Sequence, residues 1–298
     1  MKSPNTYTAT ATESITYSKL DDYAMLVKFR LSLMVVLSSI FGFLIAGEGS
    51  FELSILLALG FGGLLITGAA NALNQVLERE FDGFMSRTMD RPVAAGRMKS
   101  SEAVMFAGIA CLLGVGLLAT INPITAFLGM LSMVSYAFVY TPLKRYSTLA
   151  VAIGAIPGAL PVLIGTTAIS GQITYFGLSL FAIQFLWQFP HFWAIGYNSF
   201  EDYKKAGFKL LPTVGGKIDR SLGKHATLYA ILILPVFGFM FLMNFIGVFA
   251  LITLGLLTIG YIIFSVLFHL RFDKKSALQL MFYSFLFLPL FLLFTLIF

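Results

Sequence analysis

The sequence predicts an all-α integral membrane protein with about nine transmembrane helices. Hydrophobic residues make up 58% of the 298-residue chain and charged residues only 11%, whereas charged residues are about 25% of soluble domains. Apolar runs of roughly 20 residues recur along the chain, and each is long enough to cross the bilayer core as a helix. A β-barrel would instead show shorter alternating segments of about ten residues. The length of the runs therefore favours helices.

The apolar runs define the expected spans, which a polar, Ser- and Thr-rich segment precedes. The spans are expected near residues 31–47, 54–78, 102–120, 123–140, 148–169, 175–198, 226–244, 246–269 and 277–298. Residues 1–23 lack the apolar core of a signal peptide, and Glu13, Asp21 and Asp22 argue against an Arg-rich transit peptide. We therefore expect a flexible cytoplasmic tail over residues 1–23 and one transmembrane domain over residues 24–298.

All 20 Lys and Arg residues fall in the N-terminal segment or in alternate connectors between the spans. The other connectors, which contain EGSFE, INP, SGQ and NFIG, have no basic residue. Basic connectors stay on the cytoplasmic side of the membrane. We therefore expect a multi-pass protein of the cytoplasmic (inner) membrane, with its N-terminus in the cytoplasm and its C-terminus on the opposite side. The basic connectors 79–101 and 199–225 are longer than an ordinary link, and long loops on one face are where a site is expected.

The second expected span ends in a group of ionisable residues, within NALNQVLEREFDGFMSRTMDRP. Asn74, Glu78 and Asp82 are spaced four residues apart, so a helix places them along one face. Two carboxylates and an amide oxygen suit Mg²⁺ shared with substrate phosphates. Arg87 and Arg91 follow, and arginine binds phosphate through forked hydrogen bonds. The pattern indicates a magnesium–diphosphate site. The alternative is a helix end whose acidic and basic side chains pair with each other and with water.

A second group of the same kind ends the sixth expected span, within FLWQFPHFWAIGYNSFEDYKKAGFKLLP. Asn198 and Asp202 are again four residues apart, Glu201 lies beside them, and Lys204 and Lys205 follow. Two such groups suggest a distant internal duplication and two faces of one cavity. Since carboxylates alone would repel a diphosphate, bridging cations are needed between the groups.

Other polar residues are open to two interpretations. Tyr140, Lys144 and Arg145, in VYTPLKRYS, either add to a diphosphate clamp or anchor a helix end at the membrane interface. His191 is either a hydrogen-bonded structural residue or a functional one. The second interpretation rests on the functional bias of ionisable residues within spans and on imidazole being a ligand of haem iron.

With these motifs the sequence resembles the UbiA superfamily of intramembrane prenyltransferases and, within it, the haem O synthases (protoheme IX farnesyltransferases). NQVLEREFDGFMSRTMDRP is similar to that family's Asn-x-x-x-acid-x-x-x-Asp run with its following Arg-Thr and Arg-Pro. YTPLKRYSTLAVAIGAIPGALPVLIG and the block containing QFPHFW and DYKKAG resemble the next two motifs in order and spacing. The resemblance covers about residues 25–298. The chain departs from the family pattern at KFR, where Lys-Pro-Arg is usual, and at Gln75, Glu78 and Asn198.

The resemblance implies nine helices around a central cavity, with the site near the cytoplasmic face and with farnesyl diphosphate and haem b as substrates. It implies Mg-dependent transfer of the farnesyl group to a vinyl group of haem b, with water addition, giving haem O. The implied metal ligands are Asn74, Glu78, Asp82, Asn198 and Asp202. The implied catalytic residues are Asn74, Glu78, Asp82, Arg87, Arg91, Lys144, Arg145 and Asp202, and the implied haem-binding residues are His191, Tyr140 and Tyr203.

Three alternatives stay open from the sequence. A quinone-precursor prenyltransferase would use an aromatic acceptor, and the QFPHFW block argues against it. A cation-coupled transporter would place its site near the bilayer midplane, whereas these groups lie at the ends of spans. A non-catalytic haem-handling protein would tolerate Asp82→Asn and Asp202→Asn. Membrane lipid and a haem-modifying or oxidase-assembly protein are further expected partners, and nucleic acid is not.

Overall fold

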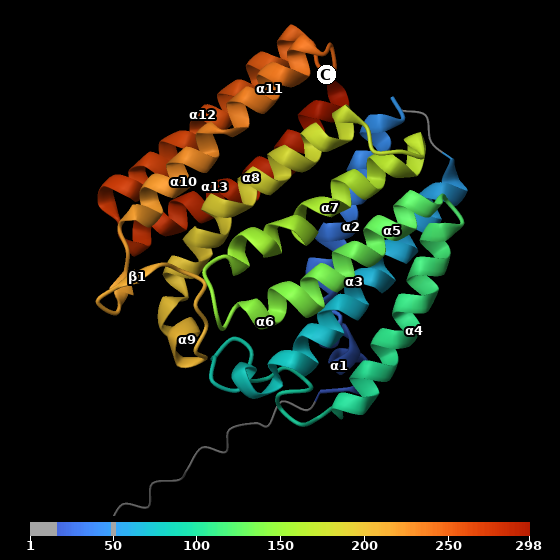
Figure 1. Cartoon of the computed structure of the whole chain (residues 1–298), viewed down its shortest axis with the longest axis vertical. Coiled ribbons are helices and arrows are strands. Elements are labelled where there is room, and N and C mark those ends of the chain that lie inside the picture. Colours follow the sequence, from blue (N-terminus) through green and yellow to red (C-terminus); the bar gives the residue numbers. More distant parts are fainter. Residues whose placement is uncertain (1–16, 49–51) are drawn as a thin grey trace, which may run out of the picture.

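A bundle of long helices makes up nearly all of the computed structural model, which describes residues 17–48 and 52–298 (Figure 1). The first half contains α1 (Lys19–Leu26), α2 (Phe29–Ala46), α3 (Leu53–Asp82), α4 (Ser100–Ala119), α5 (Pro123–Val134), the π-helix η1 (Ser135–Tyr140) and α6 (Thr141–Leu143). The second half contains α7 (Ala150–Ser170), α8 (Tyr175–Asn198), α9 (Phe200–Lys205), β1 (Thr213–Val214), β2 (Lys217–Ile218), α10 (Ser221–Ile231), α11 (Ile233–Leu242), α12 (Val248–Arg271) and α13 (Lys274–Ile297).

Within the described residues, eight helices are long and apolar enough to cross a membrane. They are α2, α3, α4, the continuous segment from α5 to α6, α7, the segment from α10 to α11, α12 and α13. The 24-residue α8 is as long as α12 and packs against α7, α10 and α13. The polar side chains Gln184, Gln188 and His191 interrupt its apolar sequence, and all three are buried. With α8 the bundle agrees with the expected number of about nine, and the all-α membrane fold is confirmed.

Two helix boundaries differ from the expectation. Helix α1 begins at Lys19, so residues 19–23 are helical and not part of a tail; residues 1–16 of the expected tail lie outside the described residues. Ser18 caps this helix, because its hydroxyl accepts from the Asp21 backbone N–H while the Asp21 carboxylate accepts from the Ser18 N–H. Helix α3 continues to Asp82, a turn beyond the expected end at residue 78.

Two side chains of α3 form hydrogen bonds to the backbone where the chain breaks between α1 and α2. The Asn71 amide donates to the Val27 carbonyl at 3.2 Å, and the Gln75 amide donates to the Met25 carbonyl at 2.8 Å. Between the two helices Lys28 adopts a left-handed conformation with φ of 47°. A non-glycine residue pays strain in that region, so the surrounding contacts must hold it there. This break directs the Lys28 side chain to α3.

Helix α7 lies in the middle of the bundle, between α8 and α5 in Figure 1. In its most apolar 18-residue stretch, 72% of the residues are buried inside the protein. Its glycines allow close packing with neighbouring helices. A Cβ atom at Gly154 would lie 2.6 Å from the Tyr140 ring, which is shorter than any normal contact. Glycine at position 154 therefore leaves the space that the Tyr140 ring occupies.

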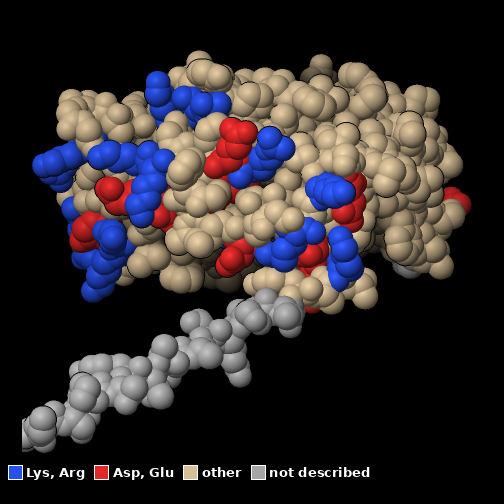
Figure 2. All heavy atoms as spheres, turned by 90° about the horizontal axis from the view of Figure 1, so that it is seen from below, with Lys and Arg blue, Asp and Glu red and all other residues tan. Residues whose placement is uncertain are grey.

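The loop 83–99, α9 and the antiparallel β1–β2 hairpin all lie at one end of the bundle, the lower end in Figure 1. Figure 2 shows this end face-on, and Lys and Arg side chains gather on it with interspersed Asp and Glu. The loop expected to carry the site therefore meets the other long connector at this end.

Candidate active site

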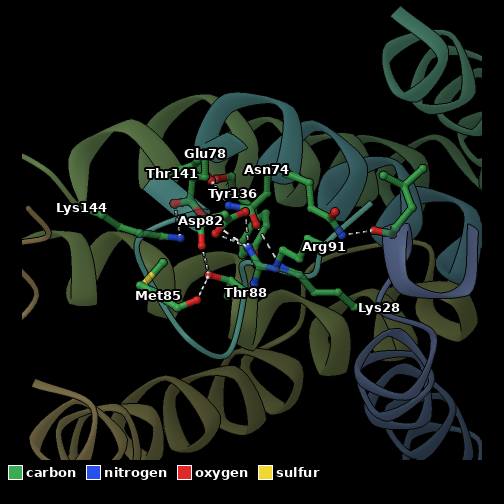
Figure 3. Close-up of polar contacts among 12 residues, drawn as sticks. Lys28, Asn74, Glu78, Asp82, Met85, Thr88, Arg91, Tyr136, Thr141 and Lys144 are labelled. Carbon is green, nitrogen blue, oxygen red and sulfur yellow. Dashed lines mark hydrogen bonds and ion pairs between the residues drawn. The ribbon is translucent and has the colours of Figure 1, made fainter. Parts of the chain in front are cut away.

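Asn74, Glu78 and Asp82 lie on one face of α3 and are almost fully buried, at 1%, 4% and 0% exposure (Figure 3). Each accepts a hydrogen bond from a different basic residue. The Lys28 ammonium lies 2.9 Å from Asn74 Oδ1, the Lys144 ammonium 2.7 Å from Glu78 Oε1, and Arg91 Nη1 2.8 Å from both Asp82 oxygens. The structure thus brings three buried oxygen-bearing residues together with the buried Lys144 and the partly exposed Lys28 and Arg91.

The basic side chains of this group pair with the acids and also lie close enough to repel one another. Burial, and after it the charges of Arg91 and Lys144, lower the pKa of the Lys28 ammonium well below its usual value. Arg91 Nη1 also lies 3.9 Å from Glu78 Oε2, so its guanidinium is shared between two carboxylates. An anion bound beside these residues would favour their charged forms. The group is therefore suited to an anionic ligand.

The loop 83–99 returns Arg91 to the end of the helix that precedes it. The Thr88 hydroxyl donates to the Asp82 carbonyl at 2.8 Å, which closes the turn after α3. Farther on, Arg97 donates to the Asp22 carboxylate at 2.8 Å and to the Asp90 carbonyl at 2.7 Å. These bonds tie the loop to α1 and fix the position from which Arg91 reaches Asp82.

The π-helix η1 places a second wall of the site opposite α3. Such segments are rare and occur frequently at functional sites. Lys144, on the turn after α6, is 8% exposed, and its ammonium lies 4.5 Å from the centre of the Tyr140 ring. The neighbouring Arg145 does not reach the acidic residues. Its exposed guanidinium stacks 4.1 Å above the Phe81 ring, so it lies at the rim of the group.

The second predicted group is built on α9 and the end of α8. Ser86 donates to the Asp202 carboxylate at 3.1 Å, and the Arg87 guanidinium lies 4.8 Å above the Tyr203 ring, so loop 83–99 joins both groups. Asn198 is less engaged, since its amide nitrogen donates to the Ala194 carbonyl of its own helix. Within the described residues, no hydrogen bond or ion pair joins Asp202 directly to the acids of α3.

Aromatic and apolar side chains fill the space between the two groups. They form one cluster that contains Met85, Phe189, Tyr203 and Phe208, with Phe81, Tyr140, Phe185, Phe192 and Trp193 packed against it. This cluster brings together α3, η1, α8 and α9. The region beside the ionic residues is therefore largely free of competing polar groups.

His191 is on α8, and its ring faces α13. Its Nδ1 is 2.7 Å from the Ser284 hydroxyl, and its ring stacks on Trp187 with a centroid distance of 4.7 Å. Through Phe192, whose ring centroid is 5.3 Å away, it touches the aromatic cluster. The structure therefore gives His191 a hydrogen-bonded structural setting at the edge of the cluster, and it does not place the ring among the ionic residues.

Sequence reasoning gave no role to three residues that complete the ionic group. Lys28 stood out only as part of KFR, and its proximity to α3 depends on the break before α2. Thr141 bonds Asn74, and Thr88 closes the turn after Asp82. Small hydroxyl residues carry no distinguishing sequence signal, so only the three-dimensional contacts identify them.

The donor chemistry of the α3 group fits a divalent cation such as Mg²⁺, because amide and carboxylate oxygens are its preferred protein ligands. In the structure these oxygens accept from Lys28, Lys144 and Arg91. No cluster of three or more His, Cys, Asp or Glu side chains with metal-site geometry occurs in the described part of the chain. Asn74, Glu78 and Asp82 would therefore hold a cation together with a ligand that occupies the basic side chains.

The bundle and its ionic group define a helical membrane protein with a site suited to an anionic ligand at one end of the bundle. The chain belongs to the UbiA prenyltransferase family, which it matches over residues 35–286.

Curated relatives and solved structures narrow the comparison. The chain is 40% identical over 272 residues to a protoheme IX farnesyltransferase of Christiangramia forsetii, covering 90% of this chain and 89% of the relative. It is 40% identical over 275 residues to the protoheme IX farnesyltransferase of Flavobacterium psychrophilum, covering 90% of each. A structure from work on digeranylgeranylglyceryl phosphate synthase has a TM-score of 0.79 at 20% identity, over 94% and 98% of the chains. An Archaeoglobus fulgidus UbiA homologue bound to GPP and Mg²⁺ has a TM-score of 0.67 at 16% identity. The comparison covers 92% of this chain and 98% of the homologue. The two structures support the fold.

Proposed function

We propose that this prenyltransferase moves a farnesyl group from farnesyl diphosphate to a vinyl group of haem b, with addition of water, forming haem O. The proposal rests on one observation in the structure. A buried row of Asn74, Glu78 and Asp82 faces three basic side chains at the end of a prenyltransferase bundle. The choice of haem as acceptor is supported by relatives named protoheme IX farnesyltransferase that are 40% identical over 90% of the chain.

The basic residues would bind the diphosphate and stabilise it as it leaves. Lys144 lies 2.7 Å from the Glu78 carboxylate and Arg91 2.8 Å from the Asp82 carboxylate, and both would turn to the phosphate oxygens. Arg87 and Arg145, at the rim, would neutralise the outer phosphate. When bound, Mg²⁺ would supply positive charge that lowers the cost of separating the diphosphate. Its proposed ligands are Asn74, Glu78, Asp82, Asn198 and Asp202.

The aromatic cluster would exclude water from the reacting carbon. Cleavage of the farnesyl C–O bond leaves an allylic cation, and the electron-rich vinyl group of haem forms the new C–C bond. Water then adds to the porphyrin-side cation and releases a proton. Tyr203 is buried in the cluster that includes Phe189, and the partly buried Tyr140 packs against it, so both would contact the haem or the farnesyl chain. His191, at the edge of this cluster, would hold or orient the haem.

The proposed orientation in the cytoplasmic membrane follows from the charged end of the bundle. Basic side chains gather on the face that carries α9 and loop 83–99 (Figure 2). Because basic loops stay on the cytoplasmic side, this face would lie in the cytoplasm together with α1. The C-terminus would lie on the other side, and residues from α1 onward would act as one domain.

The test is a pigment assay. Protein purified in detergent is incubated with haem b, farnesyl diphosphate and Mg²⁺, and the pigments are separated and analysed by mass. We expect a more apolar haem with the mass of the hydroxyethylfarnesyl product, absent with EDTA and in Asp82→Asn. A folded protein that binds haem and farnesyl diphosphate but forms no such product would overturn the proposal. The assay would then be repeated with a hydroxybenzoate acceptor.

A further inference from the structure

A single buried hydroxyl, that of Thr141, connects the α3 group to the π-helix. Thr141 is 2% exposed and Asn74 is 1% exposed, and the Asn74 amide nitrogen donates to the Thr141 hydroxyl at 3.1 Å. The Thr141 hydroxyl donates in turn to the Tyr136 carbonyl at 2.9 Å. Figure 3 shows the three residues together, beside Lys28 and the carboxylates of α3.

These bonds determine which way the Asn74 amide points. The single hydroxyl hydrogen of Thr141 is used by the Tyr136 carbonyl, so towards Asn74 the hydroxyl can only accept. On its other side Asn74 faces the Lys28 ammonium at 2.9 Å, and the charged form of this group, which a bound anion favours, can only donate. Only one orientation satisfies both neighbours, with the nitrogen towards Thr141 and Oδ1 towards the basic residues.

The π-helix makes this arrangement available. In an α-helix the Thr141 backbone N–H would bond to the carbonyl four residues back, but here it bonds to the Tyr136 carbonyl five residues back. The same carbonyl therefore receives both the N–H and the hydroxyl of Thr141. The hydroxyl is held against the helix that carries it, and its remaining lone pairs face α3.

We infer that Thr141 is a positioning residue for the metal–diphosphate site: its hydroxyl holds the Asn74 amide so that Oδ1, and not the amide nitrogen, faces the ligand. The inference rests on the proposed function, since it assigns Asn74 to binding of Mg²⁺ and diphosphate. A purely structural role would have Thr141 join two helices without affecting metal affinity. A side chain of the same shape without the hydroxyl separates the two roles. It should weaken metal binding if Thr141 positions Asn74, and leave metal affinity unchanged if Thr141 only joins the helices.

The experiment compares Thr141→Val with Thr141→Ser. Valine keeps the branched shape and removes the hydroxyl, whereas serine keeps the hydroxyl. Mn²⁺ replaces Mg²⁺ as a paramagnetic probe, and its binding is measured by electron paramagnetic resonance with farnesyl thiodiphosphate, a slowly reacting analogue. We expect Thr141→Val to weaken Mn²⁺ binding by about 10-fold or more, the usual effect of removing a partner that orients a metal ligand. Thr141→Ser should bind close to wild type.

A carboxylate at position 74 provides the matched control. In Asn74→Asp the two oxygens are equivalent, and the Thr141 hydroxyl would turn from the Tyr136 carbonyl to donate to one of them, so no choice between an oxygen and a nitrogen has to be made. Thr141→Val should therefore cost much less Mn²⁺ affinity in the Asn74→Asp background than in wild type. Equal losses in both backgrounds, or wild-type affinity in Thr141→Val that unfolds at the normal temperature, would overturn the inference. If wild-type protein shows no analogue-dependent Mn²⁺ binding, the proposed function fails and the inference fails with it.

Discussion

Replacement of Arg91 by Met is expected to destabilise the ligand-free protein by about 3 kcal/mol. Asp82 is 0% exposed and both its oxygens accept from Arg91 Nη1 at 2.8 Å. Removal of one partner of a buried ion pair costs about 3–5 kcal/mol, because the other charge remains buried without compensation. The Arg91 side chain keeps 22% exposure, so water can reach part of the site and the lower end of that range applies.

The assay is unfolding of the detergent-purified protein, measured without ligand and with Mg²⁺ and farnesyl thiodiphosphate. The double variant Arg91→Met/Asp82→Asn removes the unpaired charge and should regain most of the lost stability. Arg79→Met is the matched control, an exposed arginine on α3, the helix that carries Asp82. Its partner Glu80 lies 3.5 Å away and both side chains are largely exposed, so the loss should stay below about 1 kcal/mol.

The reasoning would be refuted if Arg91→Met were no less stable than Arg79→Met, or if the double variant were no more stable than Arg91→Met alone. Activity provides a second measurement. Loss of a group that stabilises developing charge lowers kcat by about 10²–10³-fold, so Arg91→Met should lose farnesyl transfer to that extent even when folded.

Two further predictions concern a helix cap and the wall of the site. The N–H and hydroxyl of Ser276 bond the Asp273 carboxylate and lower its pKa, so this cap stabilises α13 above the usual pKa of the group and is lost as the pH falls through the lowered value. Asp273→Ala should therefore lower the unfolding temperature more at pH 7 than in strong acid, where the carboxyl is protonated and only its neutral acceptor oxygen still caps; an equal loss at both pH values would contradict the assignment. Asp273→Asn, which keeps a neutral acceptor, should fall between Asp273→Ala and wild type at pH 7. Gly154→Ala should displace the Tyr140 ring and reduce farnesyl transfer, because the added Cβ would lie 2.6 Å from that ring. Gly108→Ala, where nothing lies within 4 Å of the added atom, should keep full activity and be slightly more stable, and equal effects of the two substitutions would refute the role given to Tyr140.

The sequence alone determined the helical membrane fold and the face of α3 that carries the acids. Hydropathy along the chain is a local property, and a span of about 20 apolar residues has few alternatives to a helix in a bilayer. The spacing of Asn74, Glu78 and Asp82 is equally local, because helical geometry places residues four apart on one face. The same holds for Asn198 and Asp202, although the structure places a break between α8 and α9 inside that pair.

Only the tertiary structure decided which partners these residues have. Lys28 is 46 residues from Asn74 in the chain, Lys144 is 66 from Glu78, and Thr141 is 67 from Asn74. Such pairs depend on how α2, α3 and η1 pack, and no residue pattern within one segment specifies that packing. The left-handed turn at Lys28 and the π-helix before Thr141 are likewise held by contacts with other helices. Local periodicity therefore places the oxygen-bearing side chains on one face of α3, and helix packing brings the basic residues and the Thr141 hydroxyl to them.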